Sequence, residues 1–205
     1  MRKVPSLPYL WGNNGGGEPQ GLAGYLQRPH RVIAFGWYGG KFSHLSWLLP
    51  LLPESHHYCE PFGGSAAVLL NRQPSPVETY NDIDGEVASF FRVLRDKTDE
   101  LVKDIALTPF SREEFFLAVS SNGEEISDVE RARRFYVRAR QARTGLAQTA
   151  SLGRWANCRN TSRAGMAGVV SRWLGSVEDL PEIALRLLRV QIENRPAVEV
   201  IRLYD

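Results

Sequence analysis

Two carboxylates in the first half of the chain follow short apolar segments. Glu60 opens the segment 60–66, EPFGGSA, and Asp82 lies in the segment 81–84, NDID. The carboxyl ends of neighbouring parallel strands meet at one edge of a sheet, which is where nucleotide-like cofactors bind. Gly63 precedes Asp82 by 19 residues, the separation typical of a glycine-rich turn and a carboxylate that binds ribose hydroxyls. We interpret the two segments as halves of one cofactor site.

A third segment, 37–41 (WYGGK), precedes both carboxylates. Its tryptophan and lysine would flank the adenosine or the amino-acid part of a cofactor. Each motif alone has a simpler interpretation: Lys41 as a surface lysine, Glu60 as an acid at a strand end, and Asp82 as a helix cap. Their common order favours a cofactor site, with Asp84 as the cap. The candidate residues are Trp37, Lys41, Glu60, Pro61, Phe62, Gly63, Gly64, Asp82 and Ile83.

These motifs require elements that position them. Segments 58–59 and 77–80 are short and apolar enough for strands that end at the two carboxylates, and 32–35 predicts a strand or an extended segment. Helices are expected over 43–49, 65–71 and 85–95, the last with Val87, Phe90, Phe91 and Leu94 on one face. This alternation predicts an α/β fold with parallel strands and right-handed crossovers.

From residue 98 the pattern becomes helical. Ser111 and Ser127 each precede a glutamate by three residues, the capping-box pattern that begins a helix. The polar segment 144–175 predicts a long loop, which is usually functional or disordered. We then expect a helix ending near Leu188 with Pro181 in its first turn, a strand over 190–192 and a last helix from Pro196. The side chains of Ile183, Leu187 and Leu188 are expected to face the core.

Basic residues concentrate in this second half. Six arginines lie between 131 and 143, and after Glu130 this stretch has no acid. A solvated basic helix is one interpretation; the other is a surface that binds phosphates without reading sequence. Arginine and asparagine in the following loop could reach base edges. The candidate DNA-binding residues are Arg134, Arg138, Arg140, Arg143, Arg154, Asn157 and Arg159.

The composition limits the classes of protein to which the chain can belong. A chain of 205 residues with 43% hydrophobic and 23% charged residues is typical of a folded globular protein, and the net charge of +2 alone does not indicate nucleic acid. Cys59 and Cys158 have no disulfide-framework or metal-ligand spacing, which predicts free thiols in a cytoplasmic protein and no metal site. No apolar run is long enough to span a membrane. Residues 1–30 predict a flexible leader without a signal peptide.

The three motifs together resemble those of the Dam-type adenine-specific DNA methyltransferases. That family has an aromatic-x-Gly-Gly-Lys segment, matched by 37–41, an acid-Pro-Phe cofactor loop, matched by 60–66, and an Asn-Asp-Ile segment, matched by 81–83. The resemblance implies a Rossmann-like methyltransferase fold with an inserted helical DNA-recognition region. It also implies S-adenosyl-L-methionine as methyl donor, double-stranded DNA as partner and the exocyclic amino group of adenine as acceptor.

The chain departs from the family in one respect. The Asp-Pro-Pro-Tyr tetrad that holds the target amino group does not occur, so we assign no catalytic residue. We expect a cofactor-binding part over 31–97, a recognition region over 98–175 and a return to the catalytic domain over 176–205, apparently truncated. A fragment, a decayed copy or a split enzyme with a second chain would fit. The rivals are a binding chain inactive on its own, an NAD-type dehydrogenase and an RNA-binding module.

Overall fold

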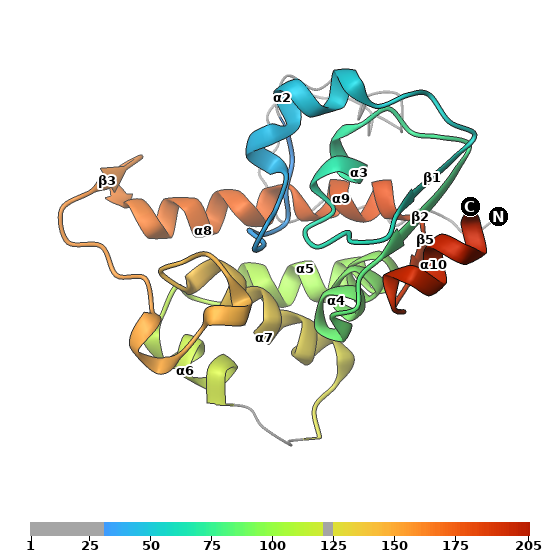
Figure 1. The fold of residues 1–205 in the computed structure, drawn as a ribbon. Coiled ribbons are helices and arrows are strands. Elements are labelled where there is room, and N and C mark those ends of the chain that lie inside the picture. The colour runs from blue at the N-terminus through green and yellow to red at the C-terminus, as the bar shows by residue number, and fades with distance from the viewer. Residues whose placement is uncertain (1–30, 121–124) are drawn as a thin grey trace, which may run out of the picture.

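A parallel three-stranded sheet organises the fold. The computed structural model describes residues 31–120 and 125–205 (Figure 1); the leader expected over 1–30 lies outside these residues. Strands β1 (His57–Glu60), β2 (Val77–Asn81) and β5 (Gln191–Glu193) lie in the order β1-β2-β5, and both pairs are parallel. The register places Glu60 opposite Tyr80, so β1 and β2 end together. The predicted strands and their direction are confirmed, and the fold is a mixed α/β fold.

Short helices fill the connections of the first half. They are η1 (Phe42–His44), α2 (Leu45–Leu48), η2 (Leu49–Leu51), α3 (Ala67–Asn71) and α4 (Gly85–Asp96), close to the predicted ranges. Segment 32–35 is buried but forms no strand; instead, the Asn71 side chain bonds both the N–H and the carbonyl of Val32, at 2.9 and 2.8 Å. Asp84 caps α4 by accepting from the N–H of Glu86, as predicted.

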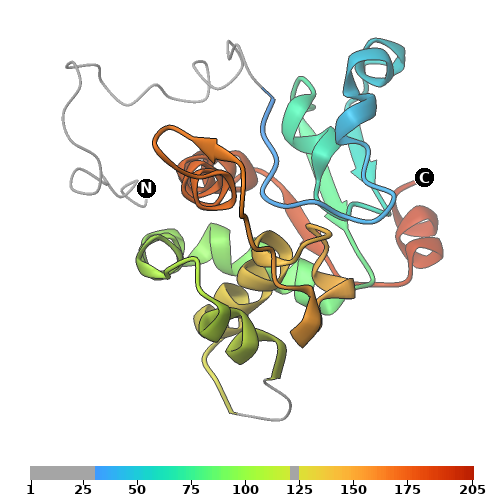
Figure 2. The same ribbon diagram turned by 90° about the vertical axis from the view of Figure 1, so that its left-hand side faces the viewer.

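The second half is mainly helical. Its elements are α5 (Thr98–Leu107), α6 (Arg112–Ser120), α7 (Asp128–Gln141), η3 (Ala147–Thr149), η4 (Leu152–Arg154), β3 (Ser162–Arg163), β4 (Met166–Ala167), α8 (Gly168–Glu178), α9 (Leu180–Leu187) and α10 (Ala197–Tyr204). The predicted serine caps are present, since Ser111 and Ser127 accept from Glu114 N–H and Glu130 N–H. In Figures 1 and 2 the β3–β4 hairpin and α10 lie at opposite ends of the molecule.

Two predictions about this half are wrong. The loop expected over 144–175 ends at Gly168, where α8 begins, and it contains the antiparallel β3–β4 pair. Leu188 is 60% exposed, whereas Leu187 is buried as expected. Leu188 is the C-cap of α9 and keeps helical backbone angles, but it lies at the end of the helix, where its side chain is left exposed.

One hydrophobic cluster spans both halves of the chain. Phe90 of α4 stacks on Tyr136 of α7 at 5.6 Å between ring centroids, and Phe35 meets Phe135 edge-on at 5.1 Å. Tyr136 in turn contacts Trp173 of α8. Aromatic rings in these geometries stabilise a core beyond the area that they bury. The sheet and the helical region therefore share a core.

A buried ion cluster fixes α9 to the sheet. Glu78 of β2 is fully buried, and Arg186 of α9, also fully buried, donates to its Oε1 at 2.7 Å. Arg72 and Arg189 approach the same carboxylate at 3.4 and 3.5 Å. Arg186 also donates to the carbonyl of Leu69 in α3. A buried carboxylate needs such partners because removing it from water is costly.

Both cysteines are free thiols, as predicted. None of the helices in 31–120 and 125–205 is long and apolar enough to cross a membrane.

Candidate functional site

A cavity of about 220 Å³ lies at the carboxyl ends of β1 and β2. All three predicted motifs contribute to its lining. Segment 37–41 lines it throughout, and Asp82 lines it from the third motif. The second motif and the residue after it contribute Glu60, Phe62, Gly63, Gly64, Ser65 and Ala67. We call it the carboxylate cavity. Parallel strands open their carboxyl ends to ligands in this way because the loops that follow them diverge.

The glycine turn is tight because protein packs against it. A Cβ on Gly63 would lie 2.2 Å from the Tyr80 ring, and a Cβ on Gly64 would lie 2.3 Å from Trp37. Tyr80 cannot withdraw easily, since its hydroxyl donates to the carbonyl of Gly64 at 2.6 Å and its ring contacts Phe91. The sequence correctly indicates a glycine turn, and the side chains of Tyr80 and Trp37 exclude a Cβ at these two glycines.

Asp82 holds the turn to the end of β2. Its Oδ2 accepts from Gly64 N–H at 2.7 Å and its Oδ1 accepts from Asp84 N–H at 2.9 Å. It does not cap α4, since Asp84 does. Each carboxylate oxygen has two lone pairs, so both can accept one further hydrogen bond from a ligand.

Glu60 and Ser65 are buried polar groups beside the same cavity. Burial raises the pKa of Glu60 to about 7, against the lowering effect of the hydrogen bond from Leu69 N–H and of the charge of Lys41. The Ser65 hydroxyl is buried without a hydrogen-bond partner in the part of the chain that the structure describes. Buried polar groups usually have partners, and such exceptions concentrate at functional sites.

Two predicted cofactor residues do not line the carboxylate cavity. Ile83 is 67% exposed, and the carbonyl of Pro61 accepts from the Asn81 side chain. Five residues that line the cavity were not among the predicted candidates: Tyr38, Gly39, Gly40, Ser65 and Ala67. Tyr38 and Ser65 lie inside the motifs, so their place in them is the signal that could have identified them.

A second cavity, of about 380 Å³, adjoins Trp37 from the helical side. Its basic residues are Arg140 at the end of α7, Arg143 just after it and Arg172 of α8. We call it the arginine cavity. The loop folds back on α7 here: Arg143 N–H donates to the carbonyl of Arg154 at 2.7 Å. This hydrogen bond places the predicted residue Arg154 next to Arg143, although Arg154 itself does not line the cavity.

The other predicted DNA residues divide into two groups. Asn157 and Arg159 are exposed, as is Arg154. Arg134 is only 7% exposed and pairs with Glu130 at 2.6 Å, and Arg138 pairs with Glu86 of α4 and donates to the carbonyl of Ala118. These two arginines contact the protein itself, because helix α7 needs partners on its packed faces, and we leave them out of the DNA surface proposed below.

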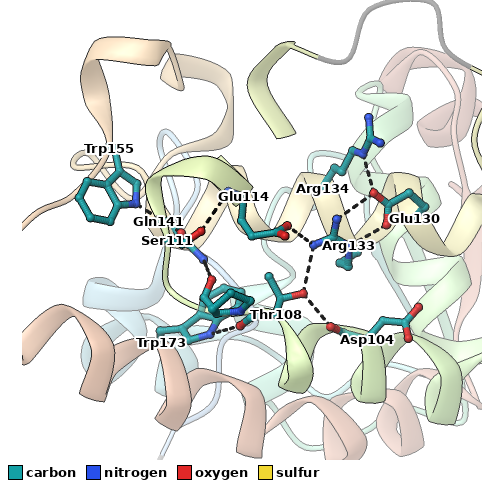
Figure 3. A network of polar contacts seen from close by, with 11 residues as sticks. Asp104, Thr108, Ser111, Glu114, Glu130, Arg133, Arg134, Gln141, Trp155 and Trp173 are labelled. Carbon is teal, nitrogen blue, oxygen red and sulfur yellow. Dashed lines mark hydrogen bonds and ion pairs between the residues drawn. The ribbon is translucent and has the colours of Figure 1, made fainter. Parts of the chain in front are cut away.

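A polar network stabilises the helices that carry the arginine cavity (Figure 3). Arg133 pairs with Glu130 at 2.6 Å and with Glu114 of α6 at 2.7 Å, and it donates to the Thr108 hydroxyl after α5. These acids raise the pKa of Arg133 above its ordinary value. At the other end, Trp155 of the loop contacts the Gln141 side chain.

The described residues contain no group of three or more histidine, cysteine or acidic side chains that could hold a metal ion. The two cavities differ in their chemistry: one has buried carboxylates and the Ser65 hydroxyl, which has no partner among the described residues, and the other has guanidinium groups. Acidic side chains suit a cationic or hydroxyl-bearing cofactor, whereas guanidinium groups suit phosphates.

Comparison with known families identifies the class of protein. A family model described as D12 class N6 adenine-specific DNA methyltransferase matches residues 37–157, which is more than half of the chain. The chain belongs to this family, and by that resemblance it is a DNA adenine methyltransferase. A comparison with curated proteins found no match. The matched range begins at Trp37 and ends at Asn157, so it includes the three motifs and most of the predicted DNA residues.

Proposed function

We propose that the protein transfers a methyl group from S-adenosyl-L-methionine to the exocyclic amino group of adenine in double-stranded DNA. The observation that carries the proposal is the carboxylate cavity, in which three motifs distant in sequence meet at the ends of two parallel strands. We further propose that the fold is Rossmann-like, with 31–97 as its cofactor-binding part, 98–175 as an inserted recognition region and 176–205 as a return to the catalytic domain.

The carboxylate cavity fits this cofactor chemically. S-adenosyl-L-methionine has an ammonium group, a sulfonium centre and two ribose hydroxyls, all of which favour acceptor groups. Glu60, once ionised, can pair with the cationic part, and Asp82 retains lone pairs for the ribose. The unpartnered Ser65 hydroxyl can bond the cofactor carboxylate or a hydroxyl. Trp37, on the wall, supplies a ring for the adenine.

The arginine side of the molecule suits the DNA backbone. Arg143, Arg154 and Arg159 are exposed, and Asn157 lies between them in the same loop. Arginines bind phosphates and position a duplex, and asparagine can bond the edge of adenine. The target adenine has to leave the base stack to reach a cofactor held inside a cavity.

The bound cofactor supplies the electrophilic methyl group. The protein's own contribution is orientation: Asp82 and the glycine turn fix the adenosine end, Glu60 holds the cationic end, and Trp37 separates the two cavities. Alignment of this kind accounts for several orders of magnitude in a bimolecular transfer.

The proposal is tested by a labelled-methyl assay on duplex DNA containing adenine, with the Glu60→Gln variant and with Asp99→Asn, an exposed acid of α5, as the matched control. Because the chain has no Asp-Pro-Pro-Tyr tetrad to hold the target amino group, we expect slow but detectable labelling of adenine with the wild type and the control, and a large further loss with Glu60→Gln. If wild type binds cofactor and DNA without transferring label, the chain is a binding component inactive on its own. Label on cytosine or on RNA alone would contradict the proposal.

A further inference from the structure

The arginine cavity differs in charge from the rest of the site. Its walls come from Gly36 and Trp37, from the end of α7 and the segment after it, from Ala156 in the loop, and from α8. A Cβ on Gly36 would lie 2.8 Å from the carbonyl of Gly145, so the wall segments are in close contact. The inference drawn from this cavity rests on the proposed function, because it concerns how the DNA substrate is held.

Three guanidinium groups line the cavity, those of Arg140, Arg143 and Arg172. None of the described residues that line it is acidic, and Arg140, Arg143 and Arg172 form no ion pair with a described carboxylate. The buried Nε of Arg140 has no hydrogen-bond partner there either. The contrast is with Arg133 on the same helix, which pairs with two glutamates. Uncompensated positive charge in a cavity attracts an anion.

Guanidinium groups only donate hydrogen bonds, and this selects the kind of anion. The exocyclic amino group of adenine is also a donor, so the arginines cannot hold it. A phosphate offers acceptor oxygens that match the guanidinium fork. The cavity chemistry therefore suits a phosphate of the DNA backbone better than the amino group of the target adenine.

Trp37 indicates which part of the backbone is meant. Its side chain lines the arginine cavity on one side and the carboxylate cavity on the other. A phosphate bound among the arginines would be separated from a cofactor in the carboxylate cavity by the Trp37 side chain. We propose that Arg140, Arg143 and Arg172 bind a backbone phosphate next to the target adenine and so position that nucleotide at the cofactor.

The test uses the full chain, a fluorescent DNA duplex and a series of salt concentrations. We compare wild type with Arg143→Gln/Arg172→Gln and with the matched double variant Arg131→Gln/Arg202→Gln. All four arginines are exposed; Arg131 lies at the opposite end of α7, and Arg202 lies on α10. In Arg143→Gln/Arg172→Gln, the loss of one phosphate contact should reduce the slope of the logarithm of the DNA association constant against the logarithm of the salt concentration by about 1. The reduction should be equal for all DNA sequences. The matched double variant should keep the wild-type slope.

Two further measurements separate the outcomes. Arg143→Lys/Arg172→Lys keeps the charge and should keep most of the slope, and cofactor binding shows that each variant is folded. If wild type shows a steep salt dependence and the cavity double variant does too, this inference is wrong while the proposed function stands. An equal loss in both double variants would also contradict it. If the variant loses only binding of inorganic phosphate, the cavity serves a free anion, and the inference is overturned. If wild type binds no DNA, the proposed function fails first.

Discussion

At the scale of single residues, the site depends on buried polar groups whose partners are incomplete. Glu60 is buried, and burial outweighs the hydrogen bond from Leu69 N–H and the charge of Lys41, so its carboxyl group remains protonated to a higher pH than in water. Glu78, by contrast, is surrounded by arginines. One carboxylate has been left open to a ligand, and the other is committed to the fold.

Glu60 makes cofactor binding depend on pH. Burial raises its pKa to about 7, so the carboxyl group is neutral below neutrality and ionised above it. A cationic cofactor favours the ionised form, so affinity should rise as pH increases from 6 to 8, approaching tenfold per unit below pH 7. Calorimetry at several pH values checks this. Glu60→Gln should bind weakly with no such dependence; the same pH profile in both proteins would exclude Glu60 as the titrating group.

Arg186 should be among the residues on which stability depends most. Arg186→Met leaves Glu78 buried with two more distant arginines, and breaking a buried pair in this way should cost about 3–5 kcal/mol. Urea unfolding measures the change. Arg202→Met removes an exposed arginine of α10 and should alter the free energy of unfolding by less than about 0.5 kcal/mol. Similar small effects from both substitutions would contradict this role for the buried pair.

At the scale of elements, the turn between β1 and α3 is the most constrained segment. Ala66, its last residue, has a left-handed conformation with φ of 55°, which costs energy for any residue with a Cβ. Gly63 and Gly64 are enclosed by Tyr80 and Trp37. The cavity shape and the stability of this turn are therefore determined by the same contacts.

Gly63→Ala should destabilise the protein and weaken cofactor binding together. The added methyl group would have to displace the Tyr80 ring, which is fixed by its hydrogen bond to Gly64, and overpacking of this kind costs about 1–3 kcal/mol. Thermal unfolding and calorimetry measure the two effects. Gly153→Ala, where nothing lies within 4 Å of the added Cβ, is the control and should change neither. A normal cofactor affinity in Gly63→Ala would show that the turn tolerates the shift.

Sequence patterns predicted the elements with a clear local signal. The strands ending at Glu60 and Asn81 follow from apolar segments before turns, and the serine caps of α6 and α7 follow from a local pattern. The β3–β4 hairpin was missed because strands of two residues have no detectable periodicity. The turn of this hairpin was also hard to recognise. Ala164 and Gly165 both have positive φ, and alanine is rare in that conformation.

The candidate site was predicted as far as its motifs extend. Their order identified the carboxylates, but it could not show that Asp82 bonds Gly64 or that the Ser65 hydroxyl lacks a partner. The separation of arginines into structural and open ones was also beyond the sequence. Arg138 and Arg140 lie two positions apart on one helix, yet of these two only Arg138 forms an ion pair with a described acid, Glu86 of α4. Such pairings depend on three-dimensional packing.

At the scale of the whole molecule, the common aromatic core should make unfolding a single transition. Phe90 and Tyr136 join the sheet side to the helical side, so the parts proposed as 31–97 and 98–175 should not melt separately. Far-UV circular dichroism and tryptophan fluorescence should therefore coincide. S-adenosyl-L-methionine at 100 times its dissociation constant should raise the stability by about 2.7 kcal/mol in both signals. Two transitions, only one of which shifts, would contradict a shared core.

The position of β5 in the sheet has a consequence for how the chain reaches this structure. Strand β5 pairs with β2 across more than 100 residues of intervening chain. The ion pair between Glu78 and Arg186 joins residues 108 positions apart. Closing so long a loop is slow because its entropy cost precedes any contact. During synthesis on a ribosome, β1 and β2 emerge before α9, so Glu78 at first lacks its ion-pair partner Arg186. The strand ends that form the carboxylate cavity are therefore synthesised before the strand and the helix that pack against them.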